Sequence, residues 1–63
     1  MLEDYPEILS VPQVAEALNI SLAAAYSLVN EHRLGCIRIG RKIKVPKYCL
    51  EEFINSAREN VML

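Results

Sequence analysis

The feature that most constrains the fold is a pair of short amphipathic segments with only two or three residues between them. Ser10 stands three positions before Gln13, which is the spacing of a capping box at a helix N-terminus. The apolar residues that follow recur at helical spacing: Val11, Val14, Ala15 and Leu18. Ser21 is a second favoured N-cap residue, and the segment after it has an apolar face made of Ala25, Leu28 and Val29. We therefore predict helices near 11–18 and 22–32, joined by the tight turn of a helix-turn-helix.

The spacing of apolar residues changes from helical to alternating after the second segment. The alternation surrounds a turn that contains Gly40, which predicts an antiparallel β-hairpin near 36–45 with a tip formed by Arg41 and Lys42. A third helix is predicted near 47–58, and its apolar stripe consists of Leu50, Phe53, Ile54 and Ala57.

A chain of 63 residues has room for one small domain, which we expect to span 1–63 with a core at about 9–58. Its apolar content of 52% and charged content of 24% are typical of a chain that folds. The order of the predicted elements then indicates a mainly α fold with a small β-hairpin. We expect residues 1–9 to form an extended lead-in and residues 60–63 to fray. No apolar run approaches the ~20 residues that cross a bilayer, and the acidic start lacks the pattern of a signal peptide. We therefore expect a cytoplasmic protein with no membrane partner.

The charge of the chain is segregated along the sequence. The net charge of −1 combines −4 over residues 1–30, +5 over residues 31–48 and −2 over residues 49–63. A weakly acidic chain is a poor general candidate for nucleic-acid binding, but phosphate contacts depend on the local field. The basic segment is therefore either a phosphate-binding surface or a hairpin that its charges keep solvated.

Four stretches of the sequence carry a resemblance to a known family: residues 9–21, 25–29, 37–46 and 50–54. In this order and spacing they resemble the excisionase-like helix-turn-helix family, a relative of the winged DNA-binding domains of MerR-type regulators. The resemblance implies a winged helix-turn-helix fold and sequence-specific binding of double-stranded DNA. It implies a second helix in the major groove, a hairpin wing on the adjacent backbone, and a role in recombination direction or transcription regulation.

On this resemblance, the second helix carries the residues that contact bases: Ser21, Ala23, Tyr26, Ser27 and Asn30. Asn30 is the best single candidate, because asparagine can pair with adenine through two hydrogen bonds. The helix begins with Leu22-Ala23-Ala24-Ala25 where the family usually has polar or basic groups, and an alanine can only touch a thymine methyl. Tyr26 either donates its hydroxyl to a phosphate or packs at the edge of the core.

Basic residues in and next to the hairpin are expected to contact the DNA backbone: Arg38, Arg41, Lys42, Lys44 and Lys47. Arg38 has an open alternative, which is an ion pair with a carboxylate of the acidic third helix. A second function class also stays open, a protein-interaction module that binds an integrase or a regulator through the apolar surface of residues 22–25. A second copy of the chain on adjacent DNA sites is another candidate partner. DNA binding requires the hairpin cations and the outward side of the second helix to lie on one face of the protein, and this arrangement distinguishes it from the protein-interaction class.

The sequence offers no constellation of residues for catalysis or for a cofactor. It has one histidine, no Gly-rich phosphate loop and too few residues to enclose a substrate pocket. His32, Cys36 and Cys49 are scattered and lack the spacing of a zinc site, and we expect the two cysteines to be free thiols. We therefore expect a protein that is not an enzyme and that uses no metal, cofactor or small-molecule substrate.

Overall fold

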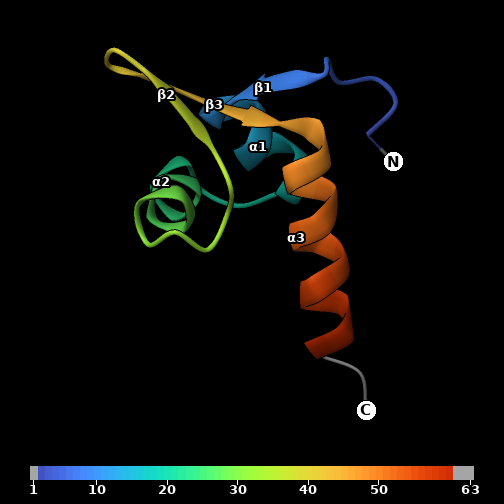
Figure 1. The fold of residues 1–63 in the computed structure, drawn as a ribbon. Helices are drawn as coiled ribbons and strands as arrows, with labels where there is room; N and C mark the ends of the chain where they lie inside the picture. The colour runs from blue at the N-terminus through green and yellow to red at the C-terminus, as the bar shows by residue number, and fades with distance from the viewer. Residues whose placement is uncertain (1, 61–63) are drawn as a thin grey trace.

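The computed structural model describes residues 2–60, with side chains described for residues 2–57. This part of the chain forms three helices and three strands (Figure 1). In chain order the elements are β1 (Ile8–Ser10), α1 (Val11–Leu18), α2 (Leu22–Asn30), β2 (Ile37–Ile39), β3 (Lys42–Pro46) and α3 (Lys47–Asn60). The fold is therefore mainly helical, with a helix-turn-helix and a small three-stranded antiparallel sheet.

The helix-turn-helix begins as its N-cap residues predict. The Gln13 backbone N–H donates to Ser10 Oγ at 3.3 Å, and the Ser10 N–H donates to Gln13 Oε1 at 2.9 Å, which completes a capping box. Ser21 Oγ accepts a hydrogen bond from the Ala24 N–H at 3.1 Å. Between the helices, Asn19 adopts the left-handed region at φ 56°, which asparagine tolerates better than most residues. The predicted bounds of α1 and the predicted start of α2 are confirmed.

The end of α2 differs from the prediction, because the helix stops at Asn30 and not at His32. His32 has φ 60°, so the backbone turns left-handed there. The Arg33 N–H then donates to the Leu28 carbonyl at 3.0 Å, which is the closing bond of a Schellman motif. This turn directs Leu34 into the core, where its side chain is 2% exposed.

Replacing His32 with glycine is expected to stabilise the protein by about 0.5–1 kcal/mol. At φ 60° a Cβ atom comes close to the following carbonyl oxygen, and glycine removes this strain at a smaller cost in chain entropy. Chemical denaturation measures the change in the free energy of unfolding. His32→Ala is the matched control, since it keeps the Cβ atom and should stay within about 0.5 kcal/mol of the parent protein. A glycine variant no more stable than the alanine variant contradicts the strain argument.

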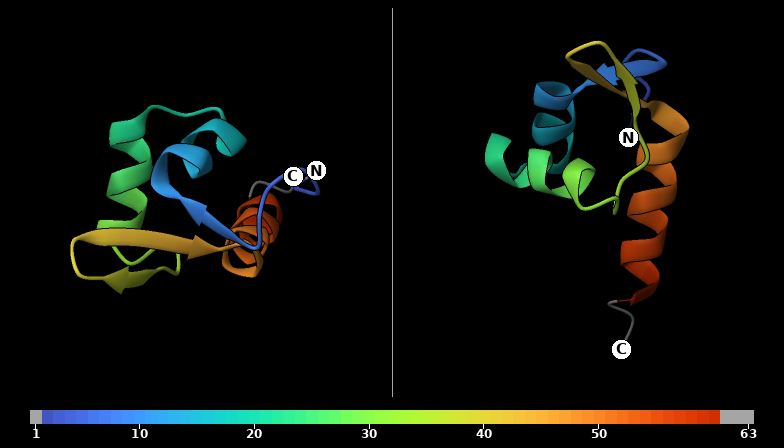
Figure 2. Two further views of the ribbon diagram at one scale, coloured as in Figure 1. Left: turned by 90° about the horizontal axis from the view of Figure 1, so that it is seen from above. Right: turned by 60° about the vertical axis from the view of Figure 1, so that its left-hand side comes forward.

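The sheet has the order β1-β3-β2, and all neighbouring strands are antiparallel (Figure 2). Leu9 of β1 pairs with Val45 of β3, so the predicted lead-in contains a strand that the sequence pattern did not reveal. In the hairpin Ile39 pairs with Lys42, which leaves a two-residue loop that begins with Gly40 at φ 59°. The predicted hairpin is confirmed, with Lys42 placed at the start of a strand instead of in the turn.

The core lies between the helix-turn-helix, the inner face of the sheet and the first turns of α3. Its largest fully buried side chains are Leu9, Leu34, Leu50, Val14, Val29 and Val45. The lead-in packs onto the same core through Leu2, which is 5% exposed. The Tyr5 hydroxyl donates to Glu16 Oε1 at 2.8 Å and ties the lead-in to α1, and this carboxylate raises the pKa of Tyr5.

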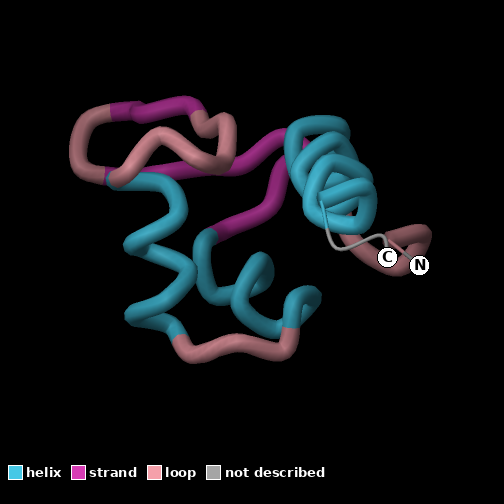
Figure 3. Tube along the Cα trace, turned by 90° about the horizontal axis from the view of Figure 1, so that it is seen from below, coloured by secondary structure: helices cyan, strands magenta, loops and turns pink. Residues whose placement is uncertain are grey.

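Helix α3 lies on the opposite side of the molecule from α2 (Figures 1 and 3). Its predicted apolar stripe is confirmed at Leu50, Phe53 and Ile54, which pack in or against the core. Ala57 is exposed, and it lies in the part of α3 that extends past the other described elements (Figure 1). The helix continues to Asn60, beyond its predicted end and into residues 60–63, which we expected to fray. Residues 61–63 lie outside the described part of the chain.

Candidate nucleic-acid interface

The outward face of α2 carries the five residues that the sequence analysis assigned to base contact. All five are exposed: Ser21, Ala23, Tyr26, Ser27 and Asn30. The opposite face of the helix is fixed in the core by Ala25 at 0% exposure and Val29 at 1%. Residues three, four and seven positions apart share one side of a helix, so the side chains from Ala23 to Asn30 form a continuous strip.

The strip has hydrogen-bonding groups along most of its length. Tyr26 and Ser27 each carry a hydroxyl, and Asn30 carries an amide. Ser21 is partly committed, since its oxygen caps the helix by accepting the Ala24 N–H, although its own hydroxyl hydrogen remains a donor. The strip can therefore offer both donors and acceptors to a ligand that lies along α2.

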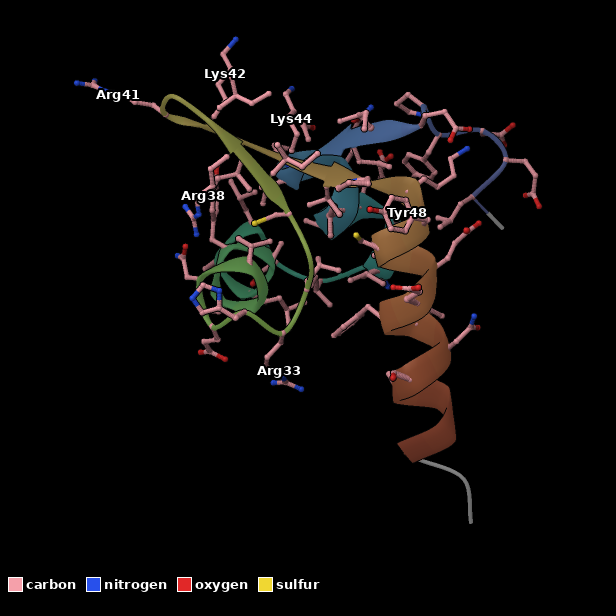
Figure 4. The ribbon with its side chains drawn as sticks, in the orientation of Figure 1. Arg33, Arg38, Arg41, Lys42, Lys44 and Tyr48 are labelled. Atoms are coloured by element: carbon pink, nitrogen blue, oxygen red, sulfur yellow. The ribbon has the colours of Figure 1, made fainter. Side chains whose placement is uncertain are left out.

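The hairpin approaches α2 through Arg38. Side chains alternate between the two faces of a sheet, and the buried pair Leu9 and Val45 marks the inner face. Ile43 lies two residues before Val45 on that face, and Arg38 is its partner in β2. Arg38 accordingly points toward α2, where its Nη2 donates to Asn30 Oδ1 at 3.2 Å (Figure 4). The alternative of an ion pair with α3 is therefore wrong for this structure, because the guanidinium bonds to α2.

The other hairpin cations lie near the tip. Arg41 extends from the loop, and Lys42 and Lys44 rise from the sheet face opposite to Arg38 (Figure 4). A shallow depression of about 220 Å³ joins this region to the two helices. It is lined by Tyr26 of α2, by Arg41, Lys42, Ile43 and Lys44 of the hairpin, and by Ser10, Val11 and Pro12 at the start of α1. We call Arg41, Lys42 and Lys44 the tip cations. The tip cations and Tyr26, on the outward side of α2, therefore line the same depression.

Lys47 is separated from this surface. It is the first residue of α3, five residues along from Lys42, which corresponds to about 16 Å of extended chain. Its Nζ lies 3.9 Å from Glu7 Oε1, and its backbone N–H donates to the Glu7 carbonyl at 2.7 Å. The Lys47 side chain is 15% exposed. The structure therefore does not bring Lys47 together with the other predicted backbone contacts.

The outer face of the sheet carries exposed isoleucines beside Lys42 and Lys44, and these isoleucines were not assigned a role from the sequence. It carries Ile8, Ile37 and Ile39, with exposures of 46%, 45% and 63%. The alternation of residues 36–40 was its only signal in the sequence, and a strand's alternation does not tell which face is inward. The apolar surface that we had assigned to residues 22–25 is smaller than expected, since Leu22 is 48% exposed but Ala25 is fully buried.

Other kinds of site find little support among the described residues. No group of three or more His, Cys, Asp or Glu side chains within residues 2–57 is arranged to hold a metal ion. Cys36 and Cys49 are half-buried free thiols. Over residues 2–60, none of the helices has the length and apolar character needed to span a membrane.

The fold and this surface define a helix-turn-helix protein, and comparison with known proteins agrees. Residues 8–58 match the helix-turn-helix domain family, and the chain belongs to that family. The chain is also 35% identical over 49 residues to a protein named excisionase from Streptomyces ambofaciens, a match that covers 78% of this chain and 79% of that protein. The comparison with solved structures found no match.

Proposed function

We propose that this chain is a sequence-specific double-stranded DNA-binding protein of the excisionase type, acting as a recombination directionality factor and not as an enzyme. The membership in the helix-turn-helix family and the similarity to an excisionase support this function. The observation that carries it is the surface on which Tyr26 of α2 and the cations Arg41 and Lys42 line one depression. A small transcription regulator would use the same contacts.

In the proposed complex α2 is the recognition helix and the hairpin is the wing of a winged helix-turn-helix. The major groove of B-DNA is about 12 Å wide and accepts one α-helix. The strip from Ala23 to Asn30, together with Ser21 before it, would face the base edges. The Ala23 methyl would lie against a thymine methyl, and the polar side chains would hydrogen-bond to donors and acceptors of the bases. Arg41, Lys42 and Lys44 would contact phosphates, which position the protein without reading sequence.

A gel-shift titration at several salt concentrations tests DNA binding directly. In the proposed complex Arg41, Lys42 and Lys44, with or without Arg38, would make three to four phosphate contacts. The logarithm of affinity should then fall with the logarithm of salt concentration at a slope of about −2.7 to −3.6. Absence of binding at low salt, or an affinity that salt does not change, contradicts the proposed function.

Lys44 and Lys47 provide a matched test of where the DNA backbone lies. Lys44→Ala should make the salt slope shallower by about 0.9, because one phosphate contact is lost. Lys47→Ala should leave the slope unchanged, because Lys47 lies at the far end of β3 and faces Glu7. Equal slopes for the two variants, or an effect confined to Lys47, contradict the proposed placement of the wing.

The second function class, a protein-interaction module, is favoured by the exposed isoleucines of the outer sheet face. Ile37 and Ile39 are 45% and 63% exposed, on the same sheet face as their cross-strand partners Lys44 and Lys42. An integrase or a second copy of the chain on an adjacent site would be the partner. Changing both isoleucines to serine should then abolish cooperative binding to a duplex with two sites while leaving the salt slope on a single site unchanged.

A further inference from the structure

We propose that Arg38 sets the base preference of Asn30, because it holds the Asn30 amide with its oxygen toward the hairpin and its NH₂ toward the DNA. Asn30 then recognises a base edge that presents hydrogen-bond acceptors, guanine before adenine. The inference rests on the proposed function, in which α2 lies in the major groove.

The orientation of the Asn30 amide follows from the chemistry of its partner. A guanidinium has five N–H donors and no acceptor, so the amide atom that faces it must be the oxygen. The distance of 3.2 Å from Arg38 Nη2 to Asn30 Oδ1 is that of a direct hydrogen bond. The amide group is planar, so the NH₂ points away from Arg38. Asn30 is exposed, which leaves this donor pair open to a ligand.

The position of Arg38 is determined by the sheet and does not depend on the bond to Asn30. Its partner across the hairpin is Ile43, on the face that also holds the buried Val45. A one-residue slip would move every hairpin side chain to the other face, so the packing of Val45 fixes the direction of Arg38. The hairpin therefore places a guanidinium on the face where it can reach the last residue of α2.

The consequence for base reading differs from the usual pairing of asparagine with adenine. That pairing needs the amide oxygen to accept from adenine N6 while the NH₂ donates to N7. Oδ1 has two lone pairs, so adenine N6 would have to share this oxygen with the Arg38 guanidinium, and the second hydrogen bond to adenine is weakened. Guanine presents two neighbouring acceptors, O6 and N7, and both suit an NH₂ group. Arg38 acts here as a positioning residue, and its remaining N–H groups can contact a phosphate at the same time.

The test is selection from a library of randomised duplexes, followed by measured affinities on matched duplex pairs. The base pair that Asn30 reads is identified as the position of the selected site whose base preference disappears when Asn30→Ala is used in the selection. The parent protein should select guanine there, with an affinity about 10-fold higher than for the adenine duplex. Arg38→Met removes the donors and releases the amide, so the ratio of guanine to adenine affinity should fall to about 1 or reverse.

Lys44→Met is the matched control, since it removes the same charge without touching Asn30. It should weaken binding to both duplexes by a similar factor and leave the guanine-to-adenine ratio unchanged. In the DNA-free protein, the side-chain NH₂ resonances of Asn30 in ¹⁵N–¹H spectra should shift in Arg38→Met and stay in place in Lys44→Met. This second measurement also shows whether each variant is folded.

The outcomes separate this inference from the proposed function. Selection of adenine by the parent protein, or an unchanged ratio in Arg38→Met, overturns the role of Arg38 and leaves DNA binding intact. A selected site in which no base preference depends on Asn30 also overturns the role of Arg38 and leaves DNA binding intact. Failure of the parent protein to bind any duplex overturns the proposed function, and the inference falls with it.

Discussion

Changing both Arg41 and Lys42 to glutamate is expected to weaken binding to every duplex by on the order of 100-fold at 0.1 M salt. Each lost phosphate contact removes about 0.9 from the salt slope, which at 0.1 M salt corresponds to about 8-fold in affinity. Two lost contacts give about 60-fold, and repulsion between glutamate and phosphate adds to it. Because phosphates carry no sequence information, the factor should be similar for the selected site and for random DNA. Gel shifts on both duplexes measure the two factors.

The fold should survive these substitutions, because both side chains are exposed at the end of the hairpin. The matched control is the double change of Arg33 and Lys47 to glutamate, which alters the net charge by the same amount. Because Lys47 is 15% exposed and faces Glu7, circular dichroism must show that the control is folded before its affinity is compared. Arg33 points away from the hairpin (Figure 4), and Lys47 follows β3 as the first residue of α3 and faces Glu7. The factor by which the control loses affinity should be less than about a tenth of the factor for the Arg41 and Lys42 double variant, because only the long-range field of the protein changes. Equal losses in the two double variants would mean that net charge, and not the wing, drives binding.

The helices were predictable because their signals are local. Ser10 with Gln13, and Ser21 with Ala24, set two helix starts through hydrogen bonds within four residues. The inward and outward sides of α2 followed from a period of 3.6 residues, and Ala25 and Val29 are buried as that period requires. The end of α2 was less predictable, since nothing in the residue types shows that His32 adopts a left-handed conformation.

The sheet was less predictable because its faces are set by a distant strand. Alternation through residues 36–45 predicts a hairpin but does not tell whether Arg38 or its isoleucine neighbours face inward. The answer comes from Leu9, which pairs with Val45 and turns that face of β3 into the core. A three-residue strand such as β1 is too short to show a period of its own. The contact between Arg38 and Asn30, and the separation of Lys47 from the tip, therefore appear only in the structure.

Truncation of Leu9 to alanine is expected to destabilise the protein by about 2–5 kcal/mol, which is enough to unfold much of it. Leu9 is 0% exposed and links β1 to the centre of the sheet, so its loss leaves a cavity and weakens the strand pairing. A chain of 63 residues has a total stability of roughly 3–9 kcal/mol at the usual 0.05–0.15 kcal/mol per residue. Circular dichroism during urea titration should therefore show a midpoint shifted to much lower urea, or no folded baseline at 25 °C.

Ile8 supplies the matched control because it is the neighbouring residue of the same strand on the opposite face. It is 46% exposed, so Ile8→Thr keeps a β-branched side chain and removes little buried area. Its destabilisation should stay below about 1 kcal/mol. If Ile8→Thr were as damaging as Leu9→Ala, the outer sheet face would be a buried interface in solution and not an open surface. If Leu9→Ala cost less than about 1 kcal/mol, β1 would not be part of the cooperative core, and the inward direction of Arg38 would lose its structural basis.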